Sequence, residues 1–411
     1  MMPNVTTEKL KNLTSLITKG STPTTYGHEF VEESDSEASF FGAYNCTYEG
    51  EPKLDKRKWI TLAANKMLAR SQLSDKDTVL CIVGNTIGSS FMVKSDILPA
   101  NINQNVALIR PIQEKIYPLY LRHIIQSPFL QHQIVQEAST QAQPSLSLKQ
   151  VGDLNIFYPA INEQQKIAKI LSTWDKAISM TDRLIENSTQ QKKALMQQLL
   201  TGKKRLLDDE GNRFEGEWEE VSIGSTSKCF SGGTPSRTKD EYYNGNIPWI
   251  TSGKLNDRYV DSVNEYITEL GLQNSSAKIV KNGSILVAMY GATAGKVALN
   301  TLDGATVNQA ILALEPKEKS HNLFLFYLLE VEMLKALLLV QGGQPNLSAT
   351  IIKAIKIKVP TYIEQQKIAI VLTNADKEIE LLEQQLADLQ QEKKALMQVL
   401  LTGKKRVVVD A

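Results

Sequence analysis

The chain has 411 residues, 42% of them hydrophobic and 22% charged, and a formal net charge of +1 at pH 7. This length exceeds one ordinary core, so we expect two or more domains, and the composition is that of a globular protein without a membrane-spanning stretch. The near-zero charge excludes a protein that holds nucleic acid by a general positive excess, so such binding would need local charge or partner subunits.

The first lobe is expected over residues 1–160 as a mixed α/β domain. Residues 79–83 and 106–109 are short apolar runs, which are typical of buried strands. Residues 118–136 have helical periodicity, and residues 156–158 predict a closing strand. The chain begins with polar residues that do not resemble a secretory signal. Three widely spaced cysteines without a CxxC motif indicate reduced thiols, so we expect a cytoplasmic protein.

Residues 161–205 are expected to form one long helix, and residues 362–411 hold a second copy of it. More than half of the aligned positions are identical, so the chain contains a duplication. Neither copy has an internal proline or glycine before Gly202 and Gly403, which predict the helix ends. Apolar residues alternate at spacings of four and three, as in a coiled-coil seam. Two helices of about 60 Å are therefore expected to pack as an antiparallel coiled coil.

A second α/β lobe is expected between the helices, over residues 206–361. Residues 285–290 and 311–314 predict buried strands, residues 323–340 a helix and residues 355–359 a closing strand. The order is therefore lobe, helix, lobe, helix, with an internal pseudo-twofold duplication. The fold class predicted is α/β, or α+β, in both lobes.

Short motifs recur in the two lobes, while the sequences between them diverge. Gly-x-Thr-Pro starts at Gly20 and Gly232, a Gly-(x)3-Gly turn follows a strand, and an Asn-Gln pair stands at 103–104 and 308–309. A shared frame with variable loops is typical of two modules that recognise different ligands. Because matched residues are poor readers of different ligands, we expect the Asn-Gln pairs to bond backbone groups and the glycines to form turns.

Identity in the helices extends to polar positions that a seam does not explain. We interpret these positions as a duplicated surface, each copy of which docks the same kind of partner. A simple spacer or dimerisation rod is the alternative. The candidates are Glu163, Gln164, Gln165, Lys166, Lys192, Lys193 and Gln197 in the first copy, and Glu364, Gln365, Gln366, Lys367, Lys393, Lys394 and Gln398 in the second. Basic triplets after the helix-ending glycines suit the helix dipole, and contact with nucleic-acid phosphate or with the docked partner is the alternative.

Catalytic signatures are missing from the sequence. Residues 291–296 have the wrong spacing for a phosphate-binding loop, and the four histidines form no ligand pattern. Neither a base-clamping methyltransferase motif nor a convincing nuclease carboxylate set is present. The sequence therefore predicts a binding protein without catalysis, metal or cofactor of its own.

With these motifs, the whole chain resembles the specificity (S) subunit of type I restriction–modification systems. The resemblance implies that each lobe reads half of a split site in double-stranded DNA, with a spacer set by the helices. It also implies two methyltransferase (M) subunits on the helices, with restriction (R) subunits joining them, so that S-adenosylmethionine, ATP and Mg²⁺ act on partners. Half-sites on one DNA face lie roughly 34 Å apart, within reach of such helices. The first lobe departs from the family at its acidic insertion, residues 32–37.

Side chains that read bases and phosphates gather in loops near the Gly-x-Thr-Pro motifs. The candidates for DNA binding in the first lobe are Lys19, Ser21, Thr22, Thr24, Thr25, Tyr26, Arg57 and Lys58. Those in the second lobe are Lys228, Ser231, Thr234, Ser236, Arg237, Lys239, Tyr242, Tyr243 and Lys254. A protein-only scaffold and an autonomous sequence-specific DNA-binding regulator are the alternative functions.

Overall fold

The computed structural model describes residues 6–33, 38–138, 143–339 and 346–408. The chain divides into two compact units, of which the first comprises residues 1–183 and 383–411 and the second residues 184–382. Each unit contains one lobe and one half of each long helix. Within the described residues, no helix is both long and apolar enough to cross a membrane.

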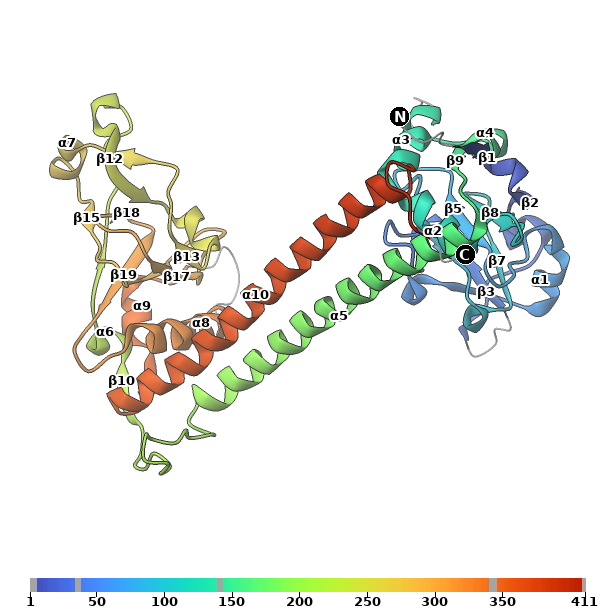
Figure 1. Cartoon of the computed structure of the whole chain (residues 1–411). Helices are drawn as coiled ribbons and strands as arrows, with labels where there is room; N and C mark the ends of the chain where they lie inside the picture. Colours follow the sequence, from blue (N-terminus) through green and yellow to red (C-terminus); the bar gives the residue numbers. More distant parts are fainter. Residues whose placement is uncertain (1–5, 34–37, 139–142, 340–345, 409–411) are drawn as a thin grey trace. The chain divides into compact units, whose positions relative to one another are not determined.

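The first unit is built on two main sheets (Figure 1). One is antiparallel, in the order β2 (Thr14–Lys19), β8 (Val106–Pro111), β5 (Thr78–Cys81) and β6 (Ser90–Met92). The other has the order β4 (Lys58–Ile60), β3 (Ala38–Phe41) and β7 (Ala100–Ile102), with β3 and β7 parallel. A further pair joins β1 (Thr7–Lys9) to β9 (Asn155–Phe157), and the α-helices are α1 (Leu62–Met67), α2 (Pro118–Gln126), α3 (Pro128–Glu137) and α4 (Leu148–Asp153).

The single helix expected over residues 118–136 is wrong, because two helices stand there. Proline lacks a backbone N–H and drives the residue before it into an extended conformation. Ser127 accordingly has a ψ of 145°, and its hydroxyl accepts a hydrogen bond from the backbone N–H of Leu130 at 3.2 Å. Ser127 therefore ends α2 and caps α3.

The second unit repeats this frame with different lengths. Its antiparallel core has the order β11 (Ser227–Ser231), β19 (Ile311–Pro316), β16 (Ile285–Ala288) and β17 (Val297–Asn300), with β13 (Tyr259–Val260) added in parallel. The second sheet has the order β14 (Tyr266–Ile267), β12 (Tyr243–Ile250), β18 (Thr306–Val307) and β15 (Lys278–Ile279). β10 (Glu219–Ser222) pairs with β20 (Lys356–Val359), and the shorter helices are α6 (Ile223–Thr226), α7 (Glu269–Gln273), α8 (Asn322–Leu339) and α9 (Ala349–Ala354).

The strand orders confirm the duplicated α/β frame. The order β2-β8-β5-β6 matches β11-β19-β16-β17, and β4-β3-β7 matches β14-β12-β18. The parallel pair is conserved too, since β3 runs parallel to β7 as β12 does to β18. Equivalent positions in the two lobes can therefore be compared strand by strand.

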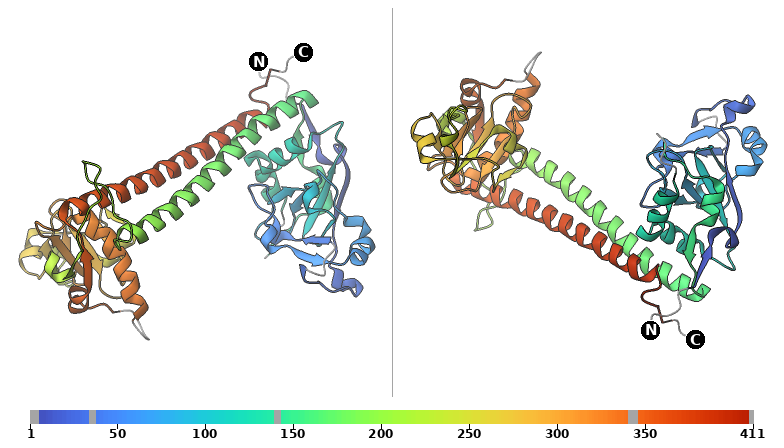
Figure 2. Two further views of the ribbon diagram at one scale, coloured as in Figure 1. Left: turned by 90° about the horizontal axis from the view of Figure 1, so that it is seen from below. Right: turned by 90° about the horizontal axis from the view of Figure 1, so that it is seen from above.

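The long helices are α5 (Ile161–Leu199) and α10 (Tyr362–Leu400). Both precede a glycine with a φ of 70°, Gly202 and Gly403, because the left-handed conformation that ends a helix suits a residue without a Cβ. In the first unit the start of α5 lies beside the end of α10, and in the second unit the end of α5 lies beside the start of α10 (Figures 1 and 2).

Each lobe completes its hydrophobic core with residues from both helices. The core of the first unit includes Ile167 and Leu171 of α5 together with Met397 and Leu400 of α10. The core of the second unit includes the matching set, Leu199 of α5 with Ile368, Ala369 and Leu372 of α10. Of the apolar positions predicted as a seam, those near the helix ends therefore pack into the cores of the lobes.

Candidate nucleic-acid interface and helix ends

The Gly-x-Thr-Pro loop of each lobe crosses the strand that ends in the Asn-Gln pair. A Cβ on Gly20 would lie 1.7 Å from the carbonyl oxygen of Ile102, and a Cβ on Gly232 would lie 1.7 Å from that of Val307. No side chain fits such an approach, so both positions require glycine. The sequence therefore marks, in both lobes, a place where two backbone segments touch.

The two motifs are joined by the same side-chain bonds in both lobes. The hydroxyl of Thr22 donates to Oε1 of Gln104 at 2.5 Å, and that of Thr234 donates to Oε1 of Gln309. Asn103 Oδ1 accepts from the backbone N–H of Asn105 at 3.0 Å, and Asn308 Oδ1 accepts from that of Ala310 at 3.1 Å. The two asparagines thus bond backbone groups as predicted, whereas the side chains of the two glutamines bond the threonine hydroxyls and not the backbone, contrary to expectation. The two threonines belong to the shared frame and do not distinguish the lobes.

A cation lies over aromatic rings at the second sheet of the second lobe. The guanidinium of Arg237 stands 4.7 Å from the ring centre of Tyr243 and 5.0 Å from that of Trp249, and it pairs with Glu265 at 2.7 Å. The Tyr243 hydroxyl donates to the carbonyl of Pro235 at 2.5 Å, which fixes the ring under the loop. The side chain of Arg237 remains 56% exposed, so a ligand can reach it.

The matching sheet of the first lobe carries different cations by a different route. Arg57 lies 4.1 Å from the ring centre of Trp59, and Lys58 lies 4.6 Å from that of Phe30. Lys58 and Trp59 belong to β4 itself, which corresponds to β14, whereas Arg237 reaches its sheet from a loop. Matching sheets of the two lobes therefore present unlike chemistry.

The remaining candidates for DNA binding divide by exposure. Those that face solvent are Lys19, Thr24, Thr25, Tyr26, Lys228, Ser236 and Lys239, while Ser21 and Ser231 are half-buried. Tyr242 is only 5% exposed, and its hydroxyl accepts from Lys239 Nζ at 2.9 Å, so its ring cannot stack on a base, contrary to expectation. Lys254 is 19% exposed and is held by Asp257 at 2.7 Å, which also differs from a free phosphate contact.

Arg70 was missed by the sequence reasoning. Its exposed guanidinium donates to the carbonyl of Lys19 at 3.4 Å and to the Ser21 hydroxyl at 3.5 Å. A turn after α1 brings it to the Gly-x-Thr-Pro loop, about 50 residues away in sequence, and no local pattern marks that return. Arg70 therefore joins the candidates of the first lobe.

The duplicated charged residues at the helix ends pair reciprocally inside the units. In the first unit Arg406 donates to the carboxylate of Glu163 from Nε at 2.8 Å and from Nη2 at 2.5 Å. In the second unit Arg205 donates to the carboxylate of Glu364 from Nε at 2.6 Å and from Nη2 at 2.7 Å. These bonds lower the pKa of Glu163 and raise the pKa of Arg205. The start of one helix copy thus binds the end of the other, in both units.

The neighbouring glutamines are also used within the chain. Gln164 accepts from the backbone N–H of Tyr117 at 2.8 Å and donates to the carbonyls of Lys115 and Pro159 at 3.0 and 2.9 Å. Gln365 makes the equivalent three bonds, to His321, Lys319 and Pro360. Glu163, Gln164, Glu364 and Gln365 are at most 3% exposed. These four do not form an exposed docking surface, contrary to expectation. Each is buried and bonded within its own unit, the glutamates to arginines and the glutamines to backbone groups.

Of the ten other duplicated candidates, five are half-buried and five are exposed. Lys192 pairs with Asp376, Lys393 with Asp175, and Lys367 with Asp209, while Lys166 donates to the carbonyl of Val408, and Gln366 is half-buried. The exposed side chains are Gln165, Lys193, Gln197, Lys394 and Gln398.

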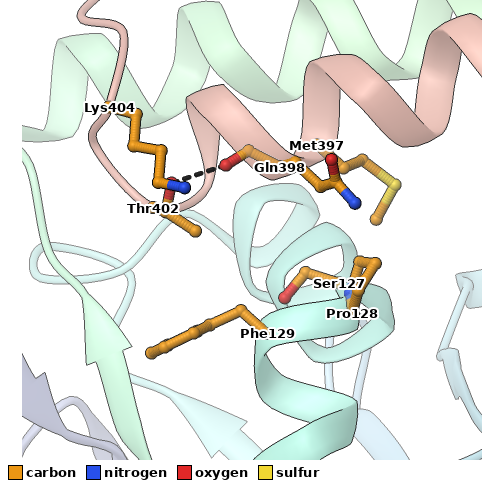
Figure 3. Close-up of a pocket in the computed structure, with 7 residues that line it drawn as sticks. All are labelled: Ser127, Pro128, Phe129, Met397, Gln398, Thr402 and Lys404. Carbon is orange, nitrogen blue, oxygen red and sulfur yellow. Dashed lines mark hydrogen bonds between the residues drawn. The ribbon is translucent and has the colours of Figure 1, made fainter.

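Gln398 lines a hollow of about 410 Å³ between α3 and the end of α10 (Figure 3). Phe129 from α3 and Lys404 from beyond α10 also line it, and Phe129 is 40% exposed. The hydroxyl of Thr402 donates to the carbonyl of Gln398 at 2.5 Å. Thus one exposed candidate adjoins an apolar hollow. Within the part of the chain that the structure describes, no group of three or more His, Cys, Asp or Glu side chains could hold a metal ion.

The family model for the type I restriction modification DNA specificity domain matches the chain twice, over residues 54–188 and 215–391. The chain belongs to this family. It is therefore a DNA sequence-recognition subunit of the type I restriction–modification class, and catalysis in such systems lies on other subunits. The family model thus matches the specificity subunit once in each half of the chain, which agrees with recognition of a bipartite site.

Individual proteins agree with this assignment. A putative type I restriction enzyme MjaX specificity subunit from Methanocaldococcus jannaschii is 29% identical over 315 residues, covering 74% of this chain and 72% of that protein. A type I S subunit from M. genitalium has the same fold at 15% identity, with a TM-score of 0.59 over 97% of this chain and 96% of that one. A chain from work on complex assembly and conformational transition of the type I R-M system gives a TM-score of 0.61 at 15% identity, covering 98% and 100%.

Proposed function

We propose that each lobe of the specificity subunit reads one half-site, through the face formed by its Gly-x-Thr-Pro loop and the adjacent sheet. The observation that carries this proposal is the unlike cation–aromatic clusters on matching sheets, with Arg57 and Lys58 in the first lobe and Arg237 in the second. A common frame sets both faces against DNA in the same way, and the different side chains then select different bases.

In the second lobe, Arg237 can exchange its carboxylate partner for an acceptor on DNA. Glu265 holds the guanidinium while DNA is absent, and the rings of Tyr243 and Trp249 fix its plane. Planar guanidinium groups match the O6 and N7 acceptors of guanine in the major groove, or two phosphate oxygens. DNA that replaces Glu265 as the acceptor meets an already oriented donor pair.

We assign the spacer to α5 and α10, packed as an antiparallel coiled coil. The reading lobes are residues 1–160 and 206–361, and the spacing segments are residues 161–205 and 362–411. Support comes from the predicted seam positions of α10, from Ile368 to Leu400, which are all buried or half-buried. Reciprocal ion pairs at both ends hold the register.

We further propose that two methyltransferase subunits dock on the exposed duplicated residues, and that restriction subunits join that assembly in the cytoplasm. Those residues are Gln165, Lys193, Gln197, Lys394 and Gln398, with the hollow beside Gln398 accepting an apolar side chain in the first unit (Figure 3). Partners would supply S-adenosylmethionine, ATP and Mg²⁺. They would also supply phosphate contacts that a chain of net charge +1 lacks.

Expression of the chain with a methyltransferase subunit tests the function, with methylated adenines mapped across a genome. We expect one bipartite motif, and a purified complex that binds a duplex carrying it. Full sequence-specific binding without the methyltransferase subunit would favour an autonomous regulator. No binding with that subunit would favour a protein-only scaffold.

Replacing Arg237 with alanine is expected to weaken binding of the cognate duplex by about 5- to 150-fold, because a well-placed arginine contact contributes about 1–3 kcal/mol of discrimination. The mapped motif should become degenerate in one half-site only. Lys254→Ala is the control, since Lys254 already bonds Asp257 and should change binding less than threefold. A change in both half-sites would contradict the assignment of Arg237 to one reader.

Four residues inserted after Met180 of α5 and four after Leu381 of α10 are expected to lengthen the unread spacer. Both positions are exposed, by 65% and 70%, so the insertions do not enter a core. Each adds about 6 Å of helix, which is about two base pairs at roughly 3.4 Å each. Methylome mapping should find the same two half-sites at a new separation; altered half-sites would contradict this division of labour.

A further inference from the structure

We propose that Gln104 and Gln309 are a matched pair of sequence-independent DNA contacts, each presenting amide donors to a phosphate of the half-site that its lobe reads. This inference rests on the proposed function, since it needs both lobes to lie on DNA. It goes beyond that function by separating anchors from readers on the same face.

The orientation of each carboxamide is fixed by the molecule. The threonine hydroxyl of the Gly-x-Thr-Pro loop donates to Oε1 in both lobes, so one lone pair of each glutamine oxygen is engaged and the threonine fixes which way the amide nitrogen faces. The amide nitrogen with its two N–H donors remains. An amide nitrogen with two N–H donors suits a phosphate, whose oxygens accept hydrogen bonds and have no donor to offer in return.

The backbone beneath each glutamine is equally fixed. Asn103 and Asn308 bind the backbone N–H two residues further on, and the N–H groups of both asparagines bond across to the neighbouring strand, at Phe41 and Ile250. In the second lobe the hydroxyl of Tyr290 also donates to the carbonyl of Gln309 at 2.7 Å. Each carboxamide is therefore carried on a rigid turn, as a positioning contact requires.

Stability of the fold does not account for the two glutamines. Both side chains are exposed, and a hydrogen bond at the surface contributes only about 0.5–1.5 kcal/mol. The sequences around them have diverged between the lobes, yet the exposed Thr-Gln pair is the same. Two readers of different sequences share one ligand, the sugar–phosphate backbone, which carries no sequence information.

Cations flank both positions. Arg70 donates to the loop that carries Thr22, and its guanidinium is exposed. In the second lobe Lys278 pairs in the strand register with Val307, two residues before Gln309, and is also exposed. A cation on a segment next to each glutamine suits a phosphate there, because it offsets the charge of the phosphate.

The test uses the chain with its methyltransferase partner and the duplex whose motif has been mapped. Gln104→Glu and Gln309→Glu keep an acceptor for the threonine hydroxyl but replace the donors with negative charge. Each is expected to weaken binding about tenfold, by the same factor on the cognate duplex and on a duplex with that half-site's bases changed, while the methylation motif is unchanged. Gln113→Glu is the matched control, exposed beyond the far end of β8, and should leave affinity within twofold.

A series of duplexes with single uncharged methylphosphonates supplies the second measurement. One substitution in each half-site should weaken wild-type binding and have no further effect on the corresponding glutamate variant. An altered methylation motif, or unchanged affinity in both variants, would overturn the inference while leaving the proposed function intact. Failure of the wild-type complex to bind a bipartite duplex would instead overturn the proposed function. Unchanged thermal unfolding midpoints exclude a folding effect.

Discussion

The Arg205→Ala variant is expected to lose about 3 kcal/mol of unfolding free energy in the second unit. Glu364 is fully buried, and both of its carboxylate oxygens accept from the Arg205 guanidinium, at 2.6 and 2.7 Å. Removing the arginine leaves a buried carboxylate without a counter-charge, and breaking a buried pair from one side costs about 3–5 kcal/mol. Arg205 also donates to the carbonyl of Gly216 at 2.8 Å, a bond that the alanine variant loses as well.

Hydrogen exchange in the second unit at increasing urea concentration measures this loss directly. The double variant Arg205→Met, Glu364→Leu is the control, since it removes both charges and should recover most of the stability. Arg406→Ala makes the matched change in the first unit. It should cost less, about 1–2 kcal/mol, because the Arg406 side chain is 45% exposed and water reaches the pair. An equal loss in the single and double variants of the second unit would contradict the buried-charge argument.

The reciprocal pairs also show where sequence reasoning about the helices stops. Apolar spacing predicted which helix positions are buried, because periodicity is local and the burial of Ile368 or Leu372 follows from its own helix. The polar residues shared by the two helix copies have partners that are remote in the sequence. Glu163 and Arg406, for example, are separated by 243 positions. Identity between copies is required equally by a shared external partner and by two internal junctions of the same chemistry. Only the three-dimensional pairing distinguishes these explanations, and it assigns the buried residues to the junctions.

The loops of the proposed DNA-binding face show the same division. The glycines at 20 and 232 were predictable as special positions, since a close backbone approach leaves a mark in the sequence. Exposure of Arg237 follows from its polar loop. The burial of Tyr242 was not predictable, because a turn of 3-10 helix at 240–242 directs it inward. Local patterns therefore located the loops, while tertiary packing decided which of their side chains remain free to bind.

The Asp376→Ala variant is expected to cost the second unit about 3 kcal/mol at pH 7 and less at pH 3. Asp376 accepts from Arg258 and from the Tyr327 hydroxyl, each at 2.6 Å, and pairs with Lys192. Alanine leaves Lys192 without its carboxylate and Tyr327 without its short bond, at positions that are largely buried. Arg258 keeps Glu330 at 2.6 and 2.8 Å, which limits the loss.

The pH dependence of this loss follows from the carboxyl group of Asp376. Burial alone would raise its pKa, but the bonds from Lys192, Tyr327 and Arg258 outweigh burial and hold the pKa below its usual range. A group with a lowered folded pKa stabilises fully above its unfolded pKa, about 3.9, and this contribution disappears as pH falls through the folded value. Urea unfolding of wild type and variant at pH 7 and pH 3 measures the difference. Asp175→Ala, the equivalent change in the first unit, should cost less, because Arg122 and His123 approach that carboxylate only to 3.4 and 3.8 Å, whereas Lys393 pairs with it closely. A cost for Asp376→Ala that stays the same at both pH values would show that packing, and not the ion network, fastens the lobe to its helices.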